Sequence, residues 1–300
     1  MKPAPFKVVR PSTIAEACEA LYEFGDDARV LAGGQSLVPL MNFRLSQPAV
    51  LVDLGPVAGL DGIELKNGEL AVGAMVRQRV AERDEAVRQH APLVSRALPL
   101  VGHLQNRNRG TIGGSLAHAD PAAELPAVAL ALDATIRLVS SAGERLVPAS
   151  EFFQGWFTAT LAEGELLVET LFPVRPRARV AIQELARRHG DFAVAGAAMV
   201  VETSGDGDAI ELASVVAFGV SSTPVRLESV ESVLVGSRLD TGAIKEAGAR
   251  AASDLTDVTD DLHASGDYRR EAIGTLVARA LVDVARSENA SGTDGSVSRS

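Results

Sequence analysis

The sequence predicts an α+β protein with several subdomains, and three observations support this prediction. Short β-type runs bounded by glycine and turn residues alternate with helical patterns up to Phe172. After a proline-rich junction, three longer β-type runs are followed by three helical patterns. The hydrophobic content of 46% over 300 residues is sufficient for two or three cores.

The first compact unit is expected within residues 1–56, where strand and helix patterns alternate. Thr13 and Glu16 form a capping-box pattern, which predicts a helix that begins at Ile14. The remaining elements expected in this unit are strands at residues 6–9, 29–31 and 50–54 and a short helix at residues 37–44.

The second unit, residues 57–175, is expected to begin with a hairpin. Asn67-Gly68 is the dipeptide most typical of a two-residue hairpin turn, and β-type residues flank it on both sides, at 63–66 and 69–72. Leu125–Leu132 is apolar on nearly all sides, which predicts a buried helix. The other elements expected here are helices at 76–89 and 92–100, a loop at 107–120, a hairpin with strands at 135–140 and 144–148, and a closing strand at 165–172.

A domain boundary is expected near residue 175, because the prolines of the stiff run Pro173–Arg177 cannot donate hydrogen bonds. The C-terminal domain, residues 176–287, is predicted to combine a three-stranded sheet with helices. Residues 288–300 are rich in serine and glycine and are predicted to form a disordered tail. The expected strands are 180–185, 195–202 and 210–220, with the turn-rich Ser204–Asp208 between the last two, and the expected helices are 229–234, 241–252 and 268–286.

Composition excludes several classes of protein. The formal net charge of −10 argues against a nucleic-acid ligand, because phosphate backbones select basic surfaces. The single cysteine, Cys18, rules out an internal disulfide and a cysteine-ligated iron–sulfur cluster within this chain. No apolar run is long enough for a transmembrane segment, and the charged N-terminus lacks the apolar stretch of a signal peptide. We therefore expect a cytoplasmic protein, at most peripheral to the inner face of the membrane.

Two Gly-Gly motifs carry the strongest functional signal, Ala32–Leu37 (AGGQSL) and Arg107–Asp120 (RNRGTIGGSLAHAD). Glycine lets the backbone approach a ligand closely, and successive backbone N–H groups in such a turn suit a phosphate. Ser36, Thr111 and Ser115 add hydroxyl groups beside these amides. The two motifs together predict a site that holds a pyrophosphate.

Other motifs add little to this prediction. Asp120 and Glu124 follow the second motif, where they either hydrogen-bond a ribose or ribityl hydroxyl or serve as surface carboxylates and helix caps. Neither glycine motif has the Rossmann or Walker spacing. His103, His118 and His189 lack the spacing of metal ligands, and no nucleophile elbow occurs. No catalytic residue and no metal ligand is therefore predicted.

The two motifs with their flanks, AGGQSLVPLMNFRLSQPAVLVDL and RNRGTIGGSLAHADPAAELPAVALALDA, resemble the FAD-binding medium subunits of the molybdenum hydroxylase family. This family includes aerobic carbon monoxide dehydrogenases and, more distantly, xanthine dehydrogenases. The resemblance runs from Phe6 to Arg286 and includes GELLVETLFP and RRHGDFAVAGAAM. It implies a two-subdomain FAD-binding domain of the vanillyl-alcohol-oxidase (PCMH) type, followed by a C-terminal α+β domain.

The resemblance also implies a noncovalent FAD in this chain, with the molybdenum cofactor and [2Fe-2S] clusters in partner subunits only. Its implied FAD contacts are residues of the two motifs, two acidic residues, one apolar residue and one aromatic residue: Ala32, Gly33, Gly34, Gln35, Ser36, Leu37, Thr111, Ile112, Gly113, Gly114, Ser115, Asp120, Glu124, Leu167 and Phe192. The chain departs from the family in two places. Gln35 stands where many relatives have histidine, and the lysine often found in the run Gln183-Glu184 is absent.

The implied role is electron transfer within a complex. Electrons from a molybdenum site in a large subunit reach the iron–sulfur clusters of a small subunit and pass through FAD to an external acceptor, which is a quinone, NAD or O2. The family typically assembles as a dimer of heterotrimers. The lack of a Rossmann motif favours a quinone or another acceptor over NAD. Two alternatives stay open: a stand-alone flavin-dependent reductase, and a flavin-free scaffold that joins two other subunits.

Overall fold

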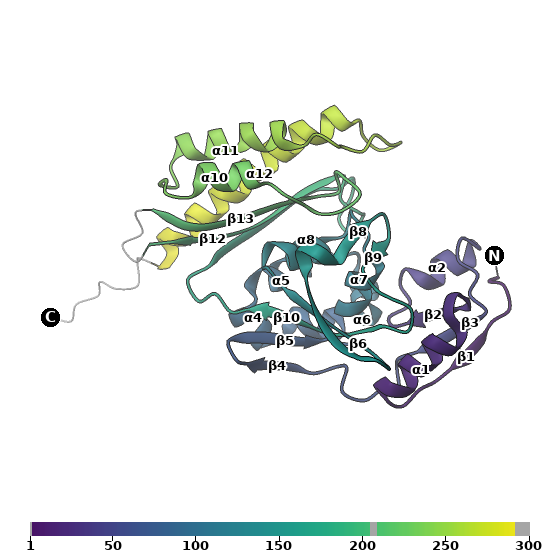
Figure 1. The fold of residues 1–300 in the computed structure, drawn as a ribbon. Helices are drawn as coiled ribbons and strands as arrows, with labels where there is room; N and C mark the ends of the chain where they lie inside the picture. Colours follow the sequence, from purple (N-terminus) through teal and green to yellow (C-terminus); the bar gives the residue numbers. More distant parts are fainter. Residues whose placement is uncertain (1, 205–208, 292–300) are drawn as a thin grey trace. The chain divides into compact units, whose positions relative to one another are not determined.

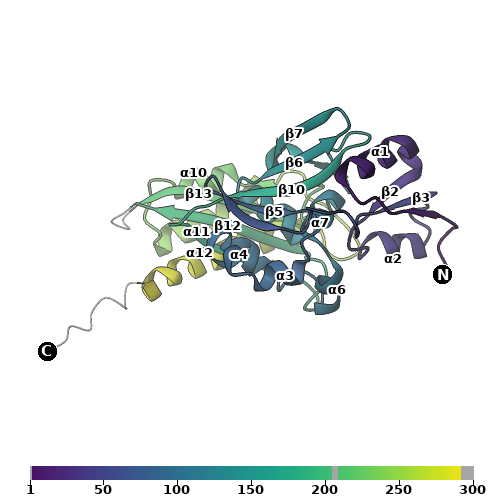
Figure 2. The same cartoon turned by 90° about the horizontal axis from the view of Figure 1, so that it is seen from below.

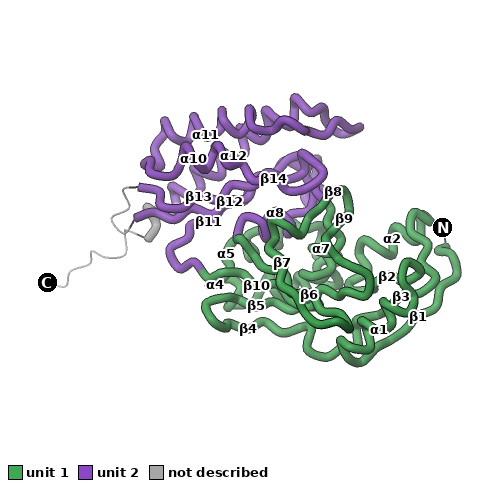
Figure 3. Tube along the Cα trace, in the orientation of Figure 1, with its two compact units in different colours: residues 1–120, 133–174 green, residues 121–132, 175–300 purple. Residues whose placement is uncertain are grey.

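The computed structural model describes residues 2–204 and 209–291 (Figure 1). The chain forms two compact units (Figure 3). Unit 1 consists of Met1–Asp120 and Asp133–Val174, and unit 2 consists of Pro121–Leu132 and Arg175–Ser300. The apolar segment before Asp133, which the sequence placed in the first domain, therefore belongs to unit 2. The mixture of helices and sheets confirms the predicted α+β class, whereas the proposed subdomains 1–56 and 57–175 stay a prediction.

The first sheet of unit 1 is small and parallel, with the order β1-β3-β2. Thr13 caps the helix that follows β1, because its hydroxyl accepts a hydrogen bond from the N–H of Glu16. The Glu16 carboxylate accepts from the N–H and hydroxyl of Ser12, so the capping interaction is reciprocal but shifted by one residue. The elements of this part are β1 (Lys7–Val9), α1 (Ile14–Phe24), the 3-10 turn η1 (Gly25–Asp27), β2 (Ala28–Leu31), α2 (Leu37–Asn42) and β3 (Val50–Asp53).

The second sheet of unit 1 is antiparallel and follows the order β4-β5-β10-β6-β7. Asn67 and Gly68 have φ angles of 52° and 81°, as a type I′ turn requires, so the predicted hairpin is confirmed. The strands are β4 (Ile63–Lys66), β5 (Glu69–Gly73), β6 (Thr135–Ser140), β7 (Gly143–Pro148) and β10 (Leu166–Pro173).

Short helices cover much of the connection between β5 and β6, and two sequence predictions are wrong here. The helix predicted over residues 76–89 is divided at Asp84, which has an extended backbone and caps the second piece by accepting from the N–H of Val87. The loop predicted at 107–120 is mostly helical, because Thr111 caps a new helix. The helices are α3 (Gln78–Arg83), α4 (Glu85–His90), α5 (Pro92–Ala97), α6 (Leu104–Arg109) and α7 (Ile112–His118). Figure 2 shows α4, α3 and α6 in a row along one side of the unit.

Between β7 and β10 the structure contains a further helix and a two-stranded ribbon that the sequence did not predict. These are α9 (Ala149–Phe152), β8 (Phe153–Gly155) and β9 (Thr158–Ala159). Phe157 lies in the turn of the ribbon with a φ angle of 51°, and its ring packs 5.1 Å from the imidazole of His118 at the end of α7.

Unit 2 is built on an antiparallel sheet with its strands in sequence order. The sheet has four strands rather than the predicted three, because Val225 and Arg226 add a short edge strand to β13. The strands are β11 (Arg179–Leu185), β12 (Ala195–Thr203), β13 (Ile210–Phe218) and β14 (Val225–Arg226). Most of the turn predicted at Ser204–Asp208 lies outside the described residues.

Helices lie on both faces of this sheet. Figure 1 shows α10 (Glu228–Leu234), α11 (Thr241–Asp254) and α12 (Gly266–Ser291) on one face and α8 (Glu124–Ala131) on the other. All residues of α8 are buried, as its uniformly apolar sequence predicted. Helix α12 continues past Glu288, where a disordered tail was predicted, and ends at Ser291. The rest of that predicted tail, residues 292–300, lies outside the described residues.

Candidate functional site

The two Gly-Gly motifs, which are far apart in sequence, contact each other within unit 1. A Cβ atom at Gly33 would lie 2.4 Å from the carbonyl oxygen of Arg109 and 2.8 Å from the Cα of Gly110, so only glycine fits there. A Cβ atom at Gly114 would lie 3.4 Å from the Cβ of Ala32. The two motifs therefore pack directly against each other, as a site that holds a pyrophosphate between them requires.

The first motif offers free backbone donors at the carboxyl end of β2. The N–H groups of Gly33, Gly34, Gln35 and Ser36 donate to no acceptor among the described residues. Gly34 has a φ angle of 73°, and a left-handed residue in a tight turn directs neighbouring N–H groups toward one side. The carboxyl edge of a parallel sheet is also the usual ligand-binding edge. This run of amides is suited to an anion such as a phosphate.

The second motif uses its amides inside the protein. The N–H of Ile112 donates to Val76 O at 3.0 Å, and that of Gly113 donates to Ala74 O at 3.0 Å. The N–H of Gly114 donates to the hydroxyl of Thr111 at 3.0 Å, as the N-cap of α7. These amides of the second motif are therefore not available to a ligand, whereas the contact of the first motif with a ligand stays a prediction. The Ser115 hydroxyl, which is half-buried, makes no hydrogen bond within the described chain.

The glycines of the second motif have a packing role instead. A Cβ atom at Gly113 would lie 2.5 Å from the Cβ of Ala74, so α7 packs directly on the segment that follows β5. At Gly114 it would lie 2.6 Å from the Thr111 hydroxyl oxygen and would disturb the cap. Neither glycine has a positive φ angle, because both lie in the first turn of a helix.

The remaining predicted residues divide between the two units. In unit 1, Ala32 and Leu37 are half-buried at the ends of the first motif, Asp120 is buried just beyond α7, and Leu167 is buried in β10 beside a register shift. In unit 2, Glu124 lies in the first turn of α8 and is only 5% exposed. Phe192 follows β11 and is 65% exposed, so its ring is available for contact with another group.

Arg77 and Arg109 were missed by the sequence analysis. A guanidinium nitrogen of Arg77 donates to the carbonyl oxygen of Arg109, the same oxygen that packs against Gly33. Burial lowers the pKa of Arg77, and the nearby positive charge of Arg109 lowers it further, whereas Asp53 acts in the opposite direction. Arg77 lies far from either motif in the sequence. Its place beside the second motif results from the pairing of residues 76–78 with residues 110–112, which the sequence does not reveal.

The histidines do not form a metal site with other residues. Within the described residues, no group of three or more histidine, cysteine, aspartate or glutamate side chains is placed to hold a metal ion. Burial lowers the pKa of His118, and the Asp120 carboxylate opposes this effect. Of the described helices, none has the length and apolar character needed to cross a membrane.

Family models match nearly the whole chain. A model of the FAD binding domain in molybdopterin dehydrogenase matches residues 4–175. A model of the CO dehydrogenase flavoprotein C-terminal domain matches residues 180–284.

Individual proteins are similar over the same length. The 6-hydroxypseudooxynicotine dehydrogenase complex subunit alpha of Paenarthrobacter nicotinovorans is 42% identical over 94% of this chain and 95% of that protein. The carbon monoxide dehydrogenase medium chain of Hydrogenophaga pseudoflava is 35% identical over 94% of this chain and 97% of that protein. A solved structure of carbon monoxide dehydrogenase from Hydrogenophaga pseudoflava superposes with a TM-score of 0.92 at 34% identity, over 95% of this chain and 99% of that chain.

Proposed function

We propose a function from one premise: the chain belongs to the family of FAD-binding medium subunits of molybdenum hydroxylases. The two family models match residues 4–175 and 180–284 of this chain, and the carbon monoxide dehydrogenase medium chain is similar over 97% of its own length. The chain is therefore a subunit of an oxidoreductase whose cofactor in this subunit is FAD.

We infer that the diphosphate of a noncovalently bound FAD lies on the first motif. The single observation that carries this inference is the run of four free amides from Gly33 to Ser36, at the carboxyl edge of the parallel sheet. The hydroxyl of Ser115 adds a donor from the second motif. The rigid contact between Gly33 and Arg109 keeps both motifs in place before the ligand binds, which lowers the ordering cost of binding.

The other predicted contacts are assigned by residue type. Glu124 is proposed to accept a hydrogen bond from a hydroxyl of FAD, and Leu167 to make an apolar contact. Phe192 is proposed to stack on the flavin, because its exposed ring is planar and apolar. Ala32, Leu37, Thr111, Ile112, Gly113, Gly114 and Asp120 are proposed to shape the surface on which the cofactor lies.

The proposed role of the subunit is electron transfer. When bound, FAD supplies the redox chemistry, and the protein supplies binding, orientation and electrostatics. We propose that electrons arrive from [2Fe-2S] clusters in a small subunit, which receives them from a large molybdenum subunit, and leave to a quinone, NAD or O2. No catalytic acid or base is assigned in this chain. The proposed assembly is a dimer of heterotrimers in the cytoplasm or at the inner face of the membrane.

We propose that the substrate is selected outside this chain. Relatives of 34–42% identity are subunits of complexes named for 6-hydroxypseudooxynicotine, caffeine, nicotine, glyceraldehyde and carbon monoxide. These compounds share no common recognition chemistry, although the medium subunits are similar throughout. Selection by the large molybdenum subunit accounts for this pattern.

The experiment is affinity purification of the chain from its native host, followed by absorption spectroscopy and metal analysis of the material that co-purifies. The proposal predicts flavin together with iron and molybdenum in two additional subunits. Anaerobic reduction of the complex, followed by mixing with a quinone, NAD or O2 separately, identifies the acceptor as the one that reoxidises the flavin fastest. Flavin without partners or metals would instead indicate a stand-alone reductase, and a complex without flavin would indicate a scaffold.

A further inference from the structure

Two arginines without a carboxylate partner lie beside the free amides of the first motif. Arg77 and Arg109 form no ion pair within the described chain. Arg77 is half-buried and donates one hydrogen bond to the Arg109 carbonyl oxygen. Most of its five guanidinium N–H donors are therefore available for a ligand. Arg109 is exposed, and its side chain makes no hydrogen bond with the described residues.

The main chain holds both arginines in place. The N–H of Ile112 donates to Val76 O at 3.0 Å, and the N–H of Gln78 donates to Gly110 O at 2.9 Å. These bonds flank an antiparallel bridge between Arg77 and Thr111. Because the Arg109 carbonyl both accepts from Arg77 and packs on Gly33, the Arg77 guanidinium lies within a few ångströms of the motif.

The local charge is positive. The carboxylate of Asp53 is the negative charge that raises the pKa of Arg77. This carboxylate is already engaged, because it pairs with Arg10 at 3.3 Å and accepts a hydrogen bond from the N–H of Gly55 at 3.0 Å. Two like charges that repel each other beside free amides favour the binding of an anion. A diphosphate carries about two negative charges, and guanidinium groups bind phosphate oxygens in bidentate geometry.

We propose that Arg77 and Arg109 bind the phosphate oxygens of the dinucleotide that occupies the first motif, so that the site discriminates by charge in favour of FAD or ADP over riboflavin. This inference rests on the proposed FAD-binding function and assigns two charged contacts to it. Arg77, which is half-buried, provides the stronger contact, and Arg109, which is exposed to solvent, provides a screened one.

The test measures dissociation constants of the full-length chain, stripped of flavin, for FAD, ADP and riboflavin by calorimetry. Arg77→Gln, Arg77→Lys and Arg109→Gln are compared with the wild type. Arg88→Gln is the matched control, because Arg88 lies on the surface of α4 in the same unit and, among the described residues, pairs only with neighbouring Glu85. Circular dichroism verifies that each variant is folded.

The expected result is a Kd for FAD and ADP raised roughly tenfold to a hundredfold by Arg77→Gln, and a few-fold by Arg109→Gln, with riboflavin unaffected. Arg77→Lys should recover part of the affinity, and FAD binding should become less sensitive to salt in the Gln variants. If both Gln variants bind FAD and ADP as tightly as Arg88→Gln, the inference is wrong while the proposed function stands. If Arg77→Gln does not fold, an unchanged Kd in Arg109→Gln and Arg77→Lys overturns it. A folded wild-type chain that binds neither FAD nor ADP would contradict the proposed function itself.

Discussion

At the scale of single residues, the glycines of the two motifs differ in the reason why a side chain is excluded. Gly34 has a positive φ angle of 73°, which disfavours any other residue. Gly33 and Gly113 have ordinary backbone angles but lie against backbone atoms of Arg109 and Ala74. The glycine pattern in the sequence predicted a ligand site. In the structure, Gly33 and Gly113 instead let separate segments of the protein pack against each other.

Replacement of Gly113 by alanine is expected to destabilise unit 1 by roughly 1–3 kcal/mol, because the new methyl group would overlap Ala74 in a tightly packed contact. The free energy of unfolding in urea measures this effect. Gly62→Ala is the matched control, since a Cβ at Gly62 meets nothing within 4 Å, and a change within about 0.5 kcal/mol is expected there. Equal effects of the two substitutions would refute the packing role.

Glu184 is a half-buried residue whose carboxyl group has an unusual environment. Its Oε2 atom is buried and makes no hydrogen bond with the part of the chain that the structure describes. Its cross-strand neighbour is Gly196, over which the ring of Phe218 lies, because a Cβ at Gly196 would be 2.1 Å from that ring. Burial raises the pKa of Glu184 to about 7.

This raised pKa predicts that stability falls as the pH rises. The unfolded state releases the proton near pH 4.5 and the folded state near pH 7, so the folded state binds more protons between these values. The loss is complete above about pH 7, and it is smaller than roughly 3 kcal/mol because solvent partly screens the half-buried carboxyl group. Unfolding in urea at pH 5 and pH 8 tests this, and Glu184→Gln should abolish the difference that is due to this residue. A pH dependence identical in wild type and variant would contradict the assignment.

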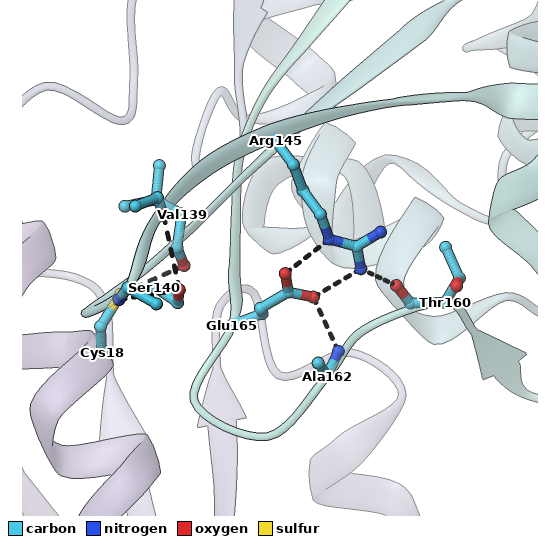
Figure 4. A network of polar contacts seen from close by, with 9 residues as sticks. Cys18, Val139, Ser140, Arg145, Thr160, Ala162 and Glu165 are labelled. Carbon is cyan, nitrogen blue, oxygen red and sulfur yellow. Dashed lines mark hydrogen bonds and ion pairs between the residues drawn. The ribbon is translucent and has the colours of Figure 1, made fainter.

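Glu165 provides a comparison of opposite sign. Its carboxylate accepts two hydrogen bonds from Arg145, at 2.6 and 2.7 Å, and one from the N–H of Ala162 at 2.7 Å (Figure 4). Arg145 lowers the pKa of Glu165. Its contribution to stability is therefore present above the ordinary glutamate pKa and is lost as the pH falls below it. Glu165→Gln should thus change the acid side of the stability profile, whereas Glu184→Gln changes the neutral side.

At the scale of secondary-structure elements, local chemistry predicted the parts that depend on few residues. The Asn67-Gly68 hairpin and the buried helix α8 are encoded by a turn dipeptide and by a uniformly apolar segment. By contrast, the first amides of α7 donate hydrogen bonds to the carbonyl groups of Ala74 and Val76, which are distant in sequence. The partnership of Arg77 with the second motif has the same origin. Such register-dependent contacts have no signature in a single sequence.

In unit 2, Arg269 of α12 connects the ends of three segments. Its guanidinium is 3% exposed, donates to the carbonyl oxygens of Val194 and Gly219, and pairs with Asp261 at 2.6 Å. Gly219 in turn donates to Pro121 O, at the segment that precedes α8. The side chain of Arg269 therefore holds the segment next to Phe192 and, through Gly219, the segment that precedes Glu124.

Loss of this side chain is expected to destabilise unit 2. Arg269→Gln leaves two carbonyl oxygens without their donor and should reduce the free energy of unfolding by roughly 2–4 kcal/mol. Arg279→Gln serves as the control, because Arg279 lies on the same helix, is exposed and makes no hydrogen bond within the described residues. A thermal or urea denaturation series that places both variants within 0.5 kcal/mol of each other, about the scatter of surface substitutions, would rule out the connecting role.

In the whole molecule, some of the residues predicted to contact FAD belong to unit 1 and others to unit 2. Unit 1 carries the amides and hydroxyls suited to a diphosphate, and unit 2 carries Glu124 and Phe192, which are suited to hydroxyl and ring contacts. The sequence resemblance predicted both sets, because its motifs span both units. Residue pattern alone indicated only a phosphate ligand, since two glycine motifs do not specify what is attached to the phosphate.

Noncovalent binding of FAD by this chain is tested by the absorption spectrum of the purified full-length chain. The chain is saturated with FAD, separated from free flavin, and precipitated with acid. We expect one flavin per chain, all of it released into the supernatant, and a large loss of bound flavin in Arg77→Gln but not in Arg88→Gln. If the folded chain retains no flavin after saturation with FAD, it does not bind FAD, and if the flavin stays in the acid precipitate, the attachment is covalent.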